Sequence, residues 1–309
     1  MWRLLSIVIR VARRAAALAF LAWATAAPAT AQEPPKAWAG VDSAIGRLGT
    51  SQPGDVRKYS FPRSDLRVTV GEVALKPALA LGSWVAFKQT SGSEVVAMGD
   101  LVLLEGEVGP VIGKLQSLGV EQTALHNHLQ QESPSVMYLH IQAHGDRVKI
   151  AEAVRAALAL TKTPAPPSSA TAQAAPLELD TVKLASALGY GGKVNGGVYQ
   201  VSVPRAEPVR MNDTEIPPSM GVATALNFQP TGGGKAAITG DFVLTANEVS
   251  PVIRSLREGG VAVTALHSHM LGEEPRLFFM HFWANDDALK LARTLHAALG
   301  HTKVRPPNP

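Results

Sequence analysis

The chain of 309 residues contains no cysteine. This absence excludes disulfide bonds, thiolate metal ligands and thiol nucleophiles together. The sequence also has no G-x-S-x-G element, and the glycine run 232–234 is not followed by the Lys-Ser/Thr pair of a phosphate-binding loop. Thiol proteases are therefore excluded, and we interpret the glycine run as a flexible loop.

Acidic residues are missing from the first 31 positions, although this segment carries four arginines. The whole chain has 29 Lys and Arg against 25 Asp and Glu, so its net charge of +4 equals these four arginines. Without residues 1–31 the count is 29 − 4 = 25 basic against 25 acidic side chains. The pI near 9.4 thus reflects this segment, and we expect neither nucleic acid nor an anionic membrane as partner.

The same segment is typical of a secretory signal peptide. Its arginines precede an apolar run, and Ala29-Thr30-Ala31 supplies small residues for cleavage. The run is shorter than the roughly 20 residues of a membrane-spanning helix, which makes a membrane anchor the weaker alternative. We expect export with cleavage after Ala31, a periplasmic or secreted protein, and no membrane span in the mature form. Arg13-Arg14 leaves the choice between Sec and twin-arginine export open.

An internal duplication organises the rest of the chain. Residues 99–146 align without a gap with residues 240–287, and 22 of these 48 positions are identical. Between the copies lies an Ala/Pro/Ser-rich segment that is typical of a linker. We therefore predict module 1 at residues 32–162, a linker at 163–176 and module 2 at 177–309, with the modules packed as a pseudo-symmetric pair.

The hydrophobic patterns within one copy predict the fold class. Residues 95–104, 120–128 and 136–143 are typical of strands, and residues 111–118 and 148–158 have helical spacing. We expect an α+β fold in which each module has a mostly antiparallel sheet covered by two helices.

Two short motifs recur in both copies beside these elements. The Gly-Asp pairs at 99–100 and 240–241 predict a turn or a bulge. The Glu-Val-x-Pro motifs at 107–110 and 248–251 predict the start of a helix, where an acidic residue suits the helix dipole.

Histidine is the most informative residue type in the sequence. Six of the nine histidines occupy three positions that recur in both copies. The matched pairs are His126/His267, His128/His269 and His140/His281. Residues two apart on a strand share a face, and the third histidine of each copy lies on the following strand. We therefore expect the three imidazoles of each copy to converge.

Three neutral imidazoles are a common ligand set for zinc and copper. We predict that the six histidines bind a divalent transition metal, with zinc and copper as the expected ions. Glu132 and Glu273 follow the second histidine of each copy by four residues. Each is a candidate general base on a metal-bound water, which would make the protein a hydrolase of an envelope or extracellular small molecule. The alternatives are a fourth-ligand role for these glutamates, one active and one degenerate copy, or a module that binds a polar ligand or partner without metal.

The doubled motifs TALHNH…ExP…H and TALHSH…ExP…H, each preceded by GD…EV…PVI, resemble the LppY/LpqO family of bacterial envelope proteins. The resemblance covers nearly the whole chain after residue 31. It implies an exported protein built from this domain and brings no established activity. The members that name the family are regarded as lipoproteins, whereas this chain has no cysteine to acylate.

Overall fold

The computed structural model describes residues 38–165 and 177–307. The predicted signal peptide at residues 1–31 and residues 166–176 of the predicted linker lie outside the described residues. Lys36–Pro309 cluster as one unit, which contains both modules. Among the described helices, none is long and apolar enough to cross a membrane.

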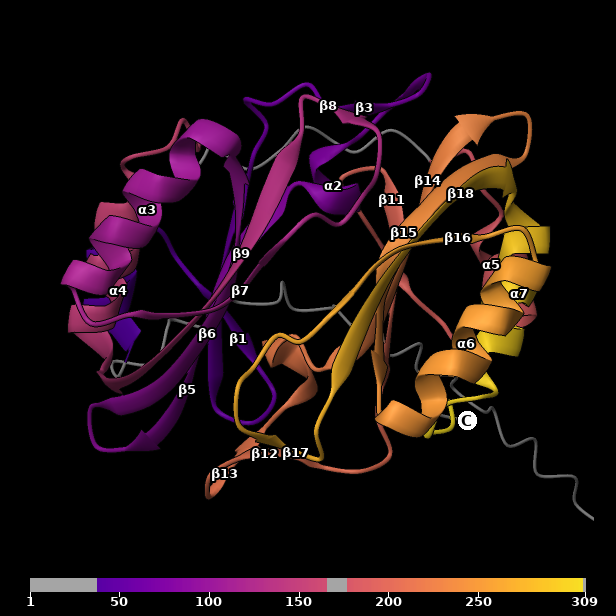
Figure 1. The fold of residues 1–309 in the computed structure, drawn as a ribbon. Coiled ribbons are helices and arrows are strands. Elements are labelled where there is room, and N and C mark those ends of the chain that lie inside the picture. Colours follow the sequence, from indigo (N-terminus) through magenta and orange to yellow (C-terminus); the bar gives the residue numbers. More distant parts are fainter. Residues whose placement is uncertain (1–37, 166–176, 308–309) are drawn as a thin grey trace, which may run out of the picture. The chain divides into compact units, whose positions relative to one another are not determined.

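The two modules repeat the same succession of elements (Figure 1). Module 1 comprises α1 (Ala39–Ile45), β1 (Thr50–Gln52), β2 (Val56–Pro62), β3 (Thr69–Val70), β4 (Val73–Ala74), α2 (Pro77–Ala80), β5 (Gly82–Ser91), β6 (Glu94–Leu104), α3 (Glu105–Ser117), β7 (Glu121–His126), β8 (Glu132–Ser133), β9 (Val136–Asp146) and α4 (Arg147–Leu158). Module 2 comprises α5 (Thr181–Leu188), β10 (Lys193–Asn195), β11 (Val198–Pro204), β12 (Val209–Met211), β13 (Thr214–Ile216), a short 3-10 helix (Pro218–Met220), β14 (Ala223–Gly232), β15 (Lys235–Leu244), α6 (Ala246–Glu258), β16 (Ala262–His267), β17 (Glu273–Glu274), β18 (Phe278–Asp287) and α7 (Ala288–Leu299).

Each module contains a six-stranded antiparallel sheet. The strand orders are β1-β2-β5-β6-β9-β7 and β10-β11-β14-β15-β18-β16, so equivalent strands occupy equivalent places. A smaller three-stranded sheet accompanies each large one, with the orders β4-β3-β8 and β13-β12-β17. The predicted α+β class, with two similar modules built on antiparallel sheets, is confirmed.

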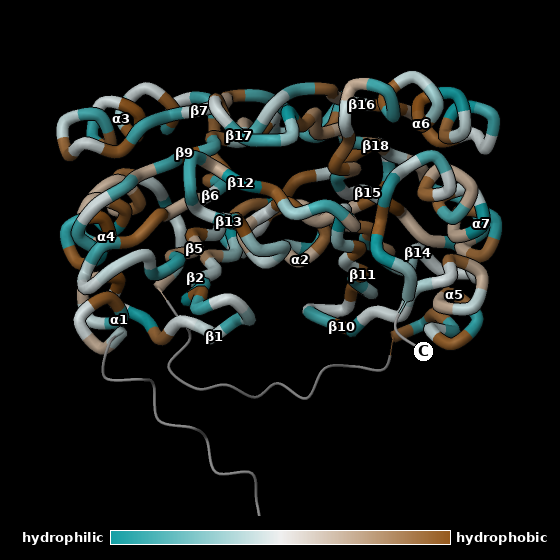
Figure 2. The backbone as a smooth tube through the Cα atoms, turned by 90° about the horizontal axis from the view of Figure 1, so that it is seen from below, coloured by the Kyte–Doolittle hydropathy of each residue, from teal (hydrophilic) through white to brown (hydrophobic). Residues whose placement is uncertain are grey.

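Helices cover one face of each large sheet. The sequence predicts two helices per module, and the structure adds a third, because α1 packs on α4 and α5 packs on α7. Figure 2 shows these three-helix groups along the outer flank of each module. The first helix after the central strand also begins earlier than its apolar spacing indicates. It starts at Glu105 in module 1 and at Ala246 in module 2.

The central strands are buried on both faces, which explains their nearly continuous apolar sequence. In β6, Val95, Ala97, Leu101 and Leu103 belong to the core beneath the helices of module 1. The alternate residues Val96 and Met98 instead pack with residues of module 2. Since side chains alternate across a strand, one face of each sheet meets its own helices and the other face meets the partner module.

Two apolar clusters join the modules. One combines residues of β6 with the β12–β13 hairpin of module 2, including Met211 and Ile216. The other combines the β3–β4 region of module 1, including Val68 and Val73, with residues of module 2 such as Val198. Each module thus extends its own small sheet against the other, which gives the pseudo-symmetric packing that the sequence predicts.

Candidate functional site

The six recurring histidines meet at the boundary between the two modules. His126 ends β7, and His128 follows it by two residues, while His140 lies in β9. The equivalent residues of module 2 occupy the end of β16, the segment after it and β18, namely His267, His269 and His281. The structure therefore brings together all six predicted metal ligands, and it does so in one shared cluster rather than in two separate sites.

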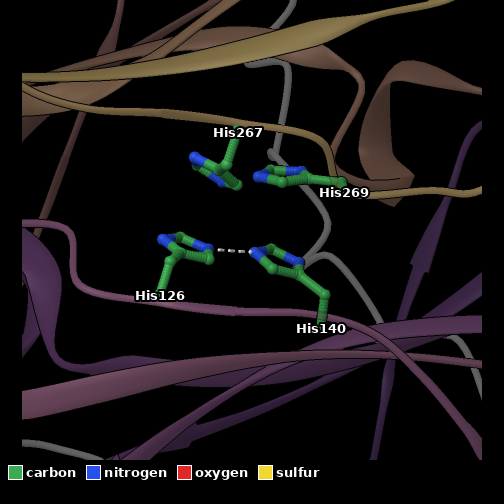
Figure 3. A group of neighbouring side chains, drawn as sticks. All are labelled: His126, His140, His267 and His269. Carbon is green, nitrogen blue, oxygen red and sulfur yellow. Dashed lines mark hydrogen bonds between the residues drawn. The ribbon is translucent and has the colours of Figure 1, made fainter.

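The imidazoles form stacked pairs that each join the two modules. Figure 3 shows His126 and His140 facing His267 and His269. The ring centroids of His126 and His267 lie 3.5 Å apart. The other two stacks have centroid distances of 3.7 Å for His128 with His281 and 3.8 Å for His140 with His269. Each stack thus contains one ring from each module.

Ring nitrogens approach one another closely within the cluster. The Nε2 atoms of His126 and His140 lie 2.9 Å apart. Four groups of side chains each place one potential ligand atom per residue within 4.8 Å of all the others. These groups are His126/His140/His267/His269, His126/His128/His281, Asp100/His128/His140 and Asp241/His269/His281.

A matched pair of hydrogen bonds fixes the histidine segments of the two modules against each other. Thr123 lies at a register shift between β7 and β9, and Thr264 lies at the equivalent shift between β16 and β18. The Thr123 hydroxyl donates to the carbonyl of His269 at 2.5 Å, and the Thr264 hydroxyl donates to the carbonyl of His128 at 2.6 Å. The Thr-Ala-Leu-His motif therefore positions the histidines of the other module as well as its own.

Asp100 and Asp241 also belong to the cluster, although their Gly-Asp motif predicts a turn or a bulge. The Gly-Asp pairs form neither, because they lie inside β6 and β15, where the pairing with β9 and β18 runs without a register shift. The glycines allow a close approach of the neighbouring strand: a Cβ atom on Gly99 would lie 2.7 Å from the carbonyl oxygen of Trp84. The alternation of side chains along β6 could have located Asp100, because Asp100 shares a face with Met98, which packs against module 2.

The strand register brings each aspartate beside the histidines of its own module. Asp100 is paired with His140 across β6 and β9, and its carboxylate lies 4.0 Å from His140 Nε2 and 3.8 Å from His128 Nε2. The equivalent pair in module 2 is Asp241 with His281 across β15 and β18. Carboxylate-to-imidazole distances there are 3.9 Å to His281 Nδ1 and 3.3 Å to His269 Nε2.

Burial keeps the imidazoles of the cluster neutral. It lowers the pKa of His126 to about 4 and the pKa of His281 to about 3. Burial, followed by repulsion from neighbouring imidazoles, also lowers the pKa of the other four, His128, His140, His267 and His269. A neutral imidazole has a ring nitrogen with a free lone pair, which is the form that binds a metal ion.

Burial has the opposite effect on the two aspartates. It raises the pKa of Asp100 to about 8 and raises the pKa of Asp241 well above its ordinary value, to which repulsion from Asp100 also contributes. No arginine or lysine of the described residues forms an ion pair with either carboxylate. Burial outweighs the charge of Lys58, which lowers the pKa of Asp100, and no described cation is in contact with either carboxylate.

Seven polar atoms of the cluster are buried and have no hydrogen-bond partner within the described part of the chain. They are Asp100 Oδ1, Asp241 Oδ1, His128 Nε2, His267 Nδ1, His267 Nε2, His269 Nε2 and His281 Nε2. The tautomer of His281 is settled by its neighbour, because Nδ1 lies 2.7 Å from the carbonyl oxygen of Gly240, which can only accept. Its Nε2 lone pair is therefore free, and the backbone orients the ring as in many metal-binding histidines.

The two predicted general bases lie outside the four candidate groups. Glu132 in β8 accepts a hydrogen bond from the backbone N–H of Val136, and Glu273 in β17 accepts one from the backbone N–H of Leu277. Glu273 also pairs with Arg276 at 3.3 Å. Both carboxylates thus brace the loop that follows the second histidine, and their role as general base stays a prediction.

A buried ion pair holds the start of the first long helix in each module. The carboxylate of Glu107, in the first turn of α3, accepts hydrogen bonds from Arg63 and from the backbone N–H of Leu104. Arg205 and Glu248 repeat this pair in module 2. The Glu-Val-x-Pro motif does mark a helix start as predicted, and its glutamate additionally neutralises a buried guanidinium.

Comparisons with known proteins give a family and no activity. A search of curated proteins finds no match. One solved structure, "Crystal structure of a trimeric bacterial microcompartment shell protein PduB", is similar at 13% identity and a TM-score of 0.22, over 82% of this chain and 90% of that chain. A likeness at that score supports no conclusion. A family model described as "Domain of Unknown Function (DUF1259)" matches residues 39–160 and again residues 182–301. Because these two matches cover most of the sequence, the chain belongs to this family and contains its domain twice.

Proposed function

We propose that this protein binds a divalent transition metal in the histidine cluster between its modules. The observation that carries the proposal is the meeting of six neutral imidazoles with several unpaired ring nitrogens in one buried place. A buried polar atom without a partner costs about 1–3 kcal/mol, so seven of them in one cluster are a strong driving force for binding.

The spacing of the ring nitrogens suits coordination. With Zn–N bonds of about 2.0–2.1 Å, two nitrogens of a tetrahedral site lie roughly 3.3 Å apart. The His126 and His140 nitrogens lie 2.9 Å apart, and the atoms of each candidate group lie within 4.8 Å. Small side-chain rotations would bring such a group onto one ion. Imidazole donors without any thiolate favour zinc or copper.

A binding function explains the geometry better than a hydrolase with a glutamate base. Such a base must reach the metal-bound water, whereas Glu132 and Glu273 accept hydrogen bonds from their own loops. Hydrolysis of an envelope or extracellular small molecule remains the alternative proposal. A module that binds a polar ligand without metal is the third alternative, and it would leave the two buried aspartates without a cation in contact with them among the described residues.

We also propose that the protein is exported to the periplasm or secreted. The arginine-rich start, the apolar run and Ala29-Thr30-Ala31 support this, as does the resemblance to the LppY/LpqO family of envelope proteins. The test is expression of the full chain with N-terminal sequencing of the product. A mature protein that begins at Gln32 is expected, and an uncleaved cytoplasmic chain would contradict export.

Metal binding is tested on protein purified without a histidine tag. Elemental analysis should find bound zinc or copper, and adding Zn²⁺ or Cu²⁺ to chelator-treated protein should raise its melting temperature. The variant H128A/H269A, which removes equivalent histidines of the candidate groups, should bind far less metal. The matched control is H144A/H301A, which removes two exposed histidines outside the cluster. No metal and no thermal shift in the unmodified protein would refute the proposal.

A further inference from the structure

We propose that the cluster binds two divalent cations per chain, one at Asp100, His128 and His140 and the other at Asp241, His269 and His281. This inference rests on the proposed metal-binding function and adds to it the number of ions, their ligands and the two aspartates. Each set comes from a single module, and the two sets occupy equivalent positions of the duplication.

The aspartates have the geometry of ligands. Asp241 Oδ2 lies 3.3 Å from His269 Nε2, which matches the roughly 3.3 Å between two ligand atoms of a tetrahedral site with bonds of about 2.0–2.2 Å. His281 would complete this set through Nε2, because its Nδ1 donates to the carbonyl of Gly240. In module 1, Asp100 Oδ2 lies 3.8 Å from His128 Nε2 and Asp100 Oδ1 lies 4.0 Å from His140 Nε2, so a contraction of about 0.5–0.7 Å would complete that set. Each aspartate also has one buried oxygen without a partner in the described part of the chain.

A single central ion accounts for fewer of these features. An ion at His126, His140, His267 and His269 would leave five of the seven buried atoms unpaired: Asp100 Oδ1, Asp241 Oδ1, His128 Nε2, His281 Nε2 and one nitrogen of His267. Two ions at the aspartate-containing sets engage the residues of the first four of these atoms, and His269 as well. They also supply the positive charge that two desolvated carboxylates require.

The ligand set restricts the kind of ion. Two imidazoles and one carboxylate suit Zn²⁺, Fe²⁺, Mn²⁺ and Co²⁺, whereas a carboxylate oxygen is a poor ligand for Cu⁺. Three protein ligands leave at least one coordination position for water or another small ligand. His126 and His267, stacked on each other between the two sets, are close enough to fill such positions, since His126 is grouped with His128 and His140 in turn.

The experiment is a count of bound ions on the untagged, chelator-treated chain after dialysis against Zn²⁺. Native mass spectrometry should find two ions in the unmodified protein, one in D100N, one in D241N and none in the double variant. Substituting a residue that only hydrogen-bonds to a metal ligand lowers metal affinity by up to about 100-fold. Loss of a ligand itself should therefore weaken the affected site by at least about 100-fold. The matched control is D146N/D287N, which makes the same Asp-to-Asn change at the equivalent N-caps of α4 and α7, outside the candidate groups, and should keep two ions.

The possible outcomes separate the two proposals. One ion in the unmodified protein, or two ions that persist in D100N/D241N, would overturn this inference and leave metal binding intact. No ion in the unmodified protein would overturn metal binding itself. Should the variants fail to fold by circular dichroism, X-ray absorption of the unmodified Zn²⁺ protein decides: mixed oxygen and imidazole scattering supports the two sets, and four imidazoles without oxygen refute them.

Discussion

Truncating Glu248 to alanine should destabilise the protein strongly, and more strongly than the equivalent truncation of Glu107. The buried Glu248 carboxylate accepts hydrogen bonds from Arg205 at 2.6 Å and 3.2 Å. It also accepts the backbone N–H groups of Thr245 and Lys303 at 2.7 Å and 2.8 Å. It therefore joins strand, helix and C-terminal segment around one guanidinium that is only 2% exposed.

The size of the effect follows from what remains after truncation. In E248A, Arg205 keeps one carboxylate partner among the described residues, Glu207, which is 39% exposed and 3.3 Å away. Breaking a buried ion pair by removing one partner costs about 3–5 kcal/mol, and E248A should lie at the upper end. In module 1, Arg63 keeps Asp65, whose carboxylate is 18% exposed and 2.9 Å away. E107A should therefore cost about 1–2 kcal/mol less than E248A.

Urea unfolding followed by far-UV circular dichroism measures both effects, with the free energy taken from the first transition that each variant weakens. The glutamine variants E107Q and E248Q are matched controls. They keep the side-chain volume and one acceptor oxygen but lose the charge and the second acceptor, so each should fall between the unmodified protein and its alanine variant. Equal losses for E107A and E248A, or a larger loss for E107A, would refute this reasoning.

Two further predictions concern polar groups elsewhere in the fold. Burial raises the pKa of Asp42, but hydrogen bonds from Arg57 and Tyr59 outweigh burial and hold that pKa below 3.8. The ionised Asp42 therefore stabilises the fold fully above pH 3.8, and this stabilisation is lost as the pH falls through the lowered pKa. Urea unfolding at pH 6 and pH 3 should show a D42N penalty that shrinks at the lower pH, and a constant penalty would contradict the prediction. Removing both inter-module bonds in T123V/T264V should cost about 1–3 kcal/mol in total and weaken Zn²⁺ binding, which calorimetric titration measures; unchanged Zn²⁺ affinity would show that these bonds do not position the histidines.

The sequence predicts the elements of each module well where the burial of apolar side chains alone decides the structure. The central strand at residues 95–104 is observed as β6 at Glu94–Leu104. The helix predicted at residues 111–118 is observed as Glu105–Ser117, six residues longer at its start. The start of this helix carries Glu105 and Glu107. It is held by the hydrogen bond of Glu107 with the Leu104 backbone and by the ion pair of Glu107 with Arg63. Hydrophobic spacing cannot detect that kind of stabilisation.

The candidate site was predictable in its residues and not in its arrangement. The three matched histidine positions identify all six imidazoles, because recurrence separates them from the scattered His144, His296 and His301. Their union in one cluster depends on how two sheet faces pack, which no local pattern encodes. The aspartates were missed for a related reason. A Gly-Asp pair is typical of turns, and only the register of β6 with β9 reveals that Asp100 faces His140.

The stacking pattern explains why both copies carry the same three histidines. His128 of module 1 stacks on His281, and the equivalent residue of module 2, His269, stacks on His140. Such reciprocal contacts between two different positions are typical of a two-fold interface between identical chains. The His126/His267 stack joins two equivalent positions, as expected for residues on the two-fold axis. Losing a histidine from one module would therefore remove a contact of the other module too. The stacks therefore couple the histidine packing of the two modules, even where the ligands of one ion all come from one module.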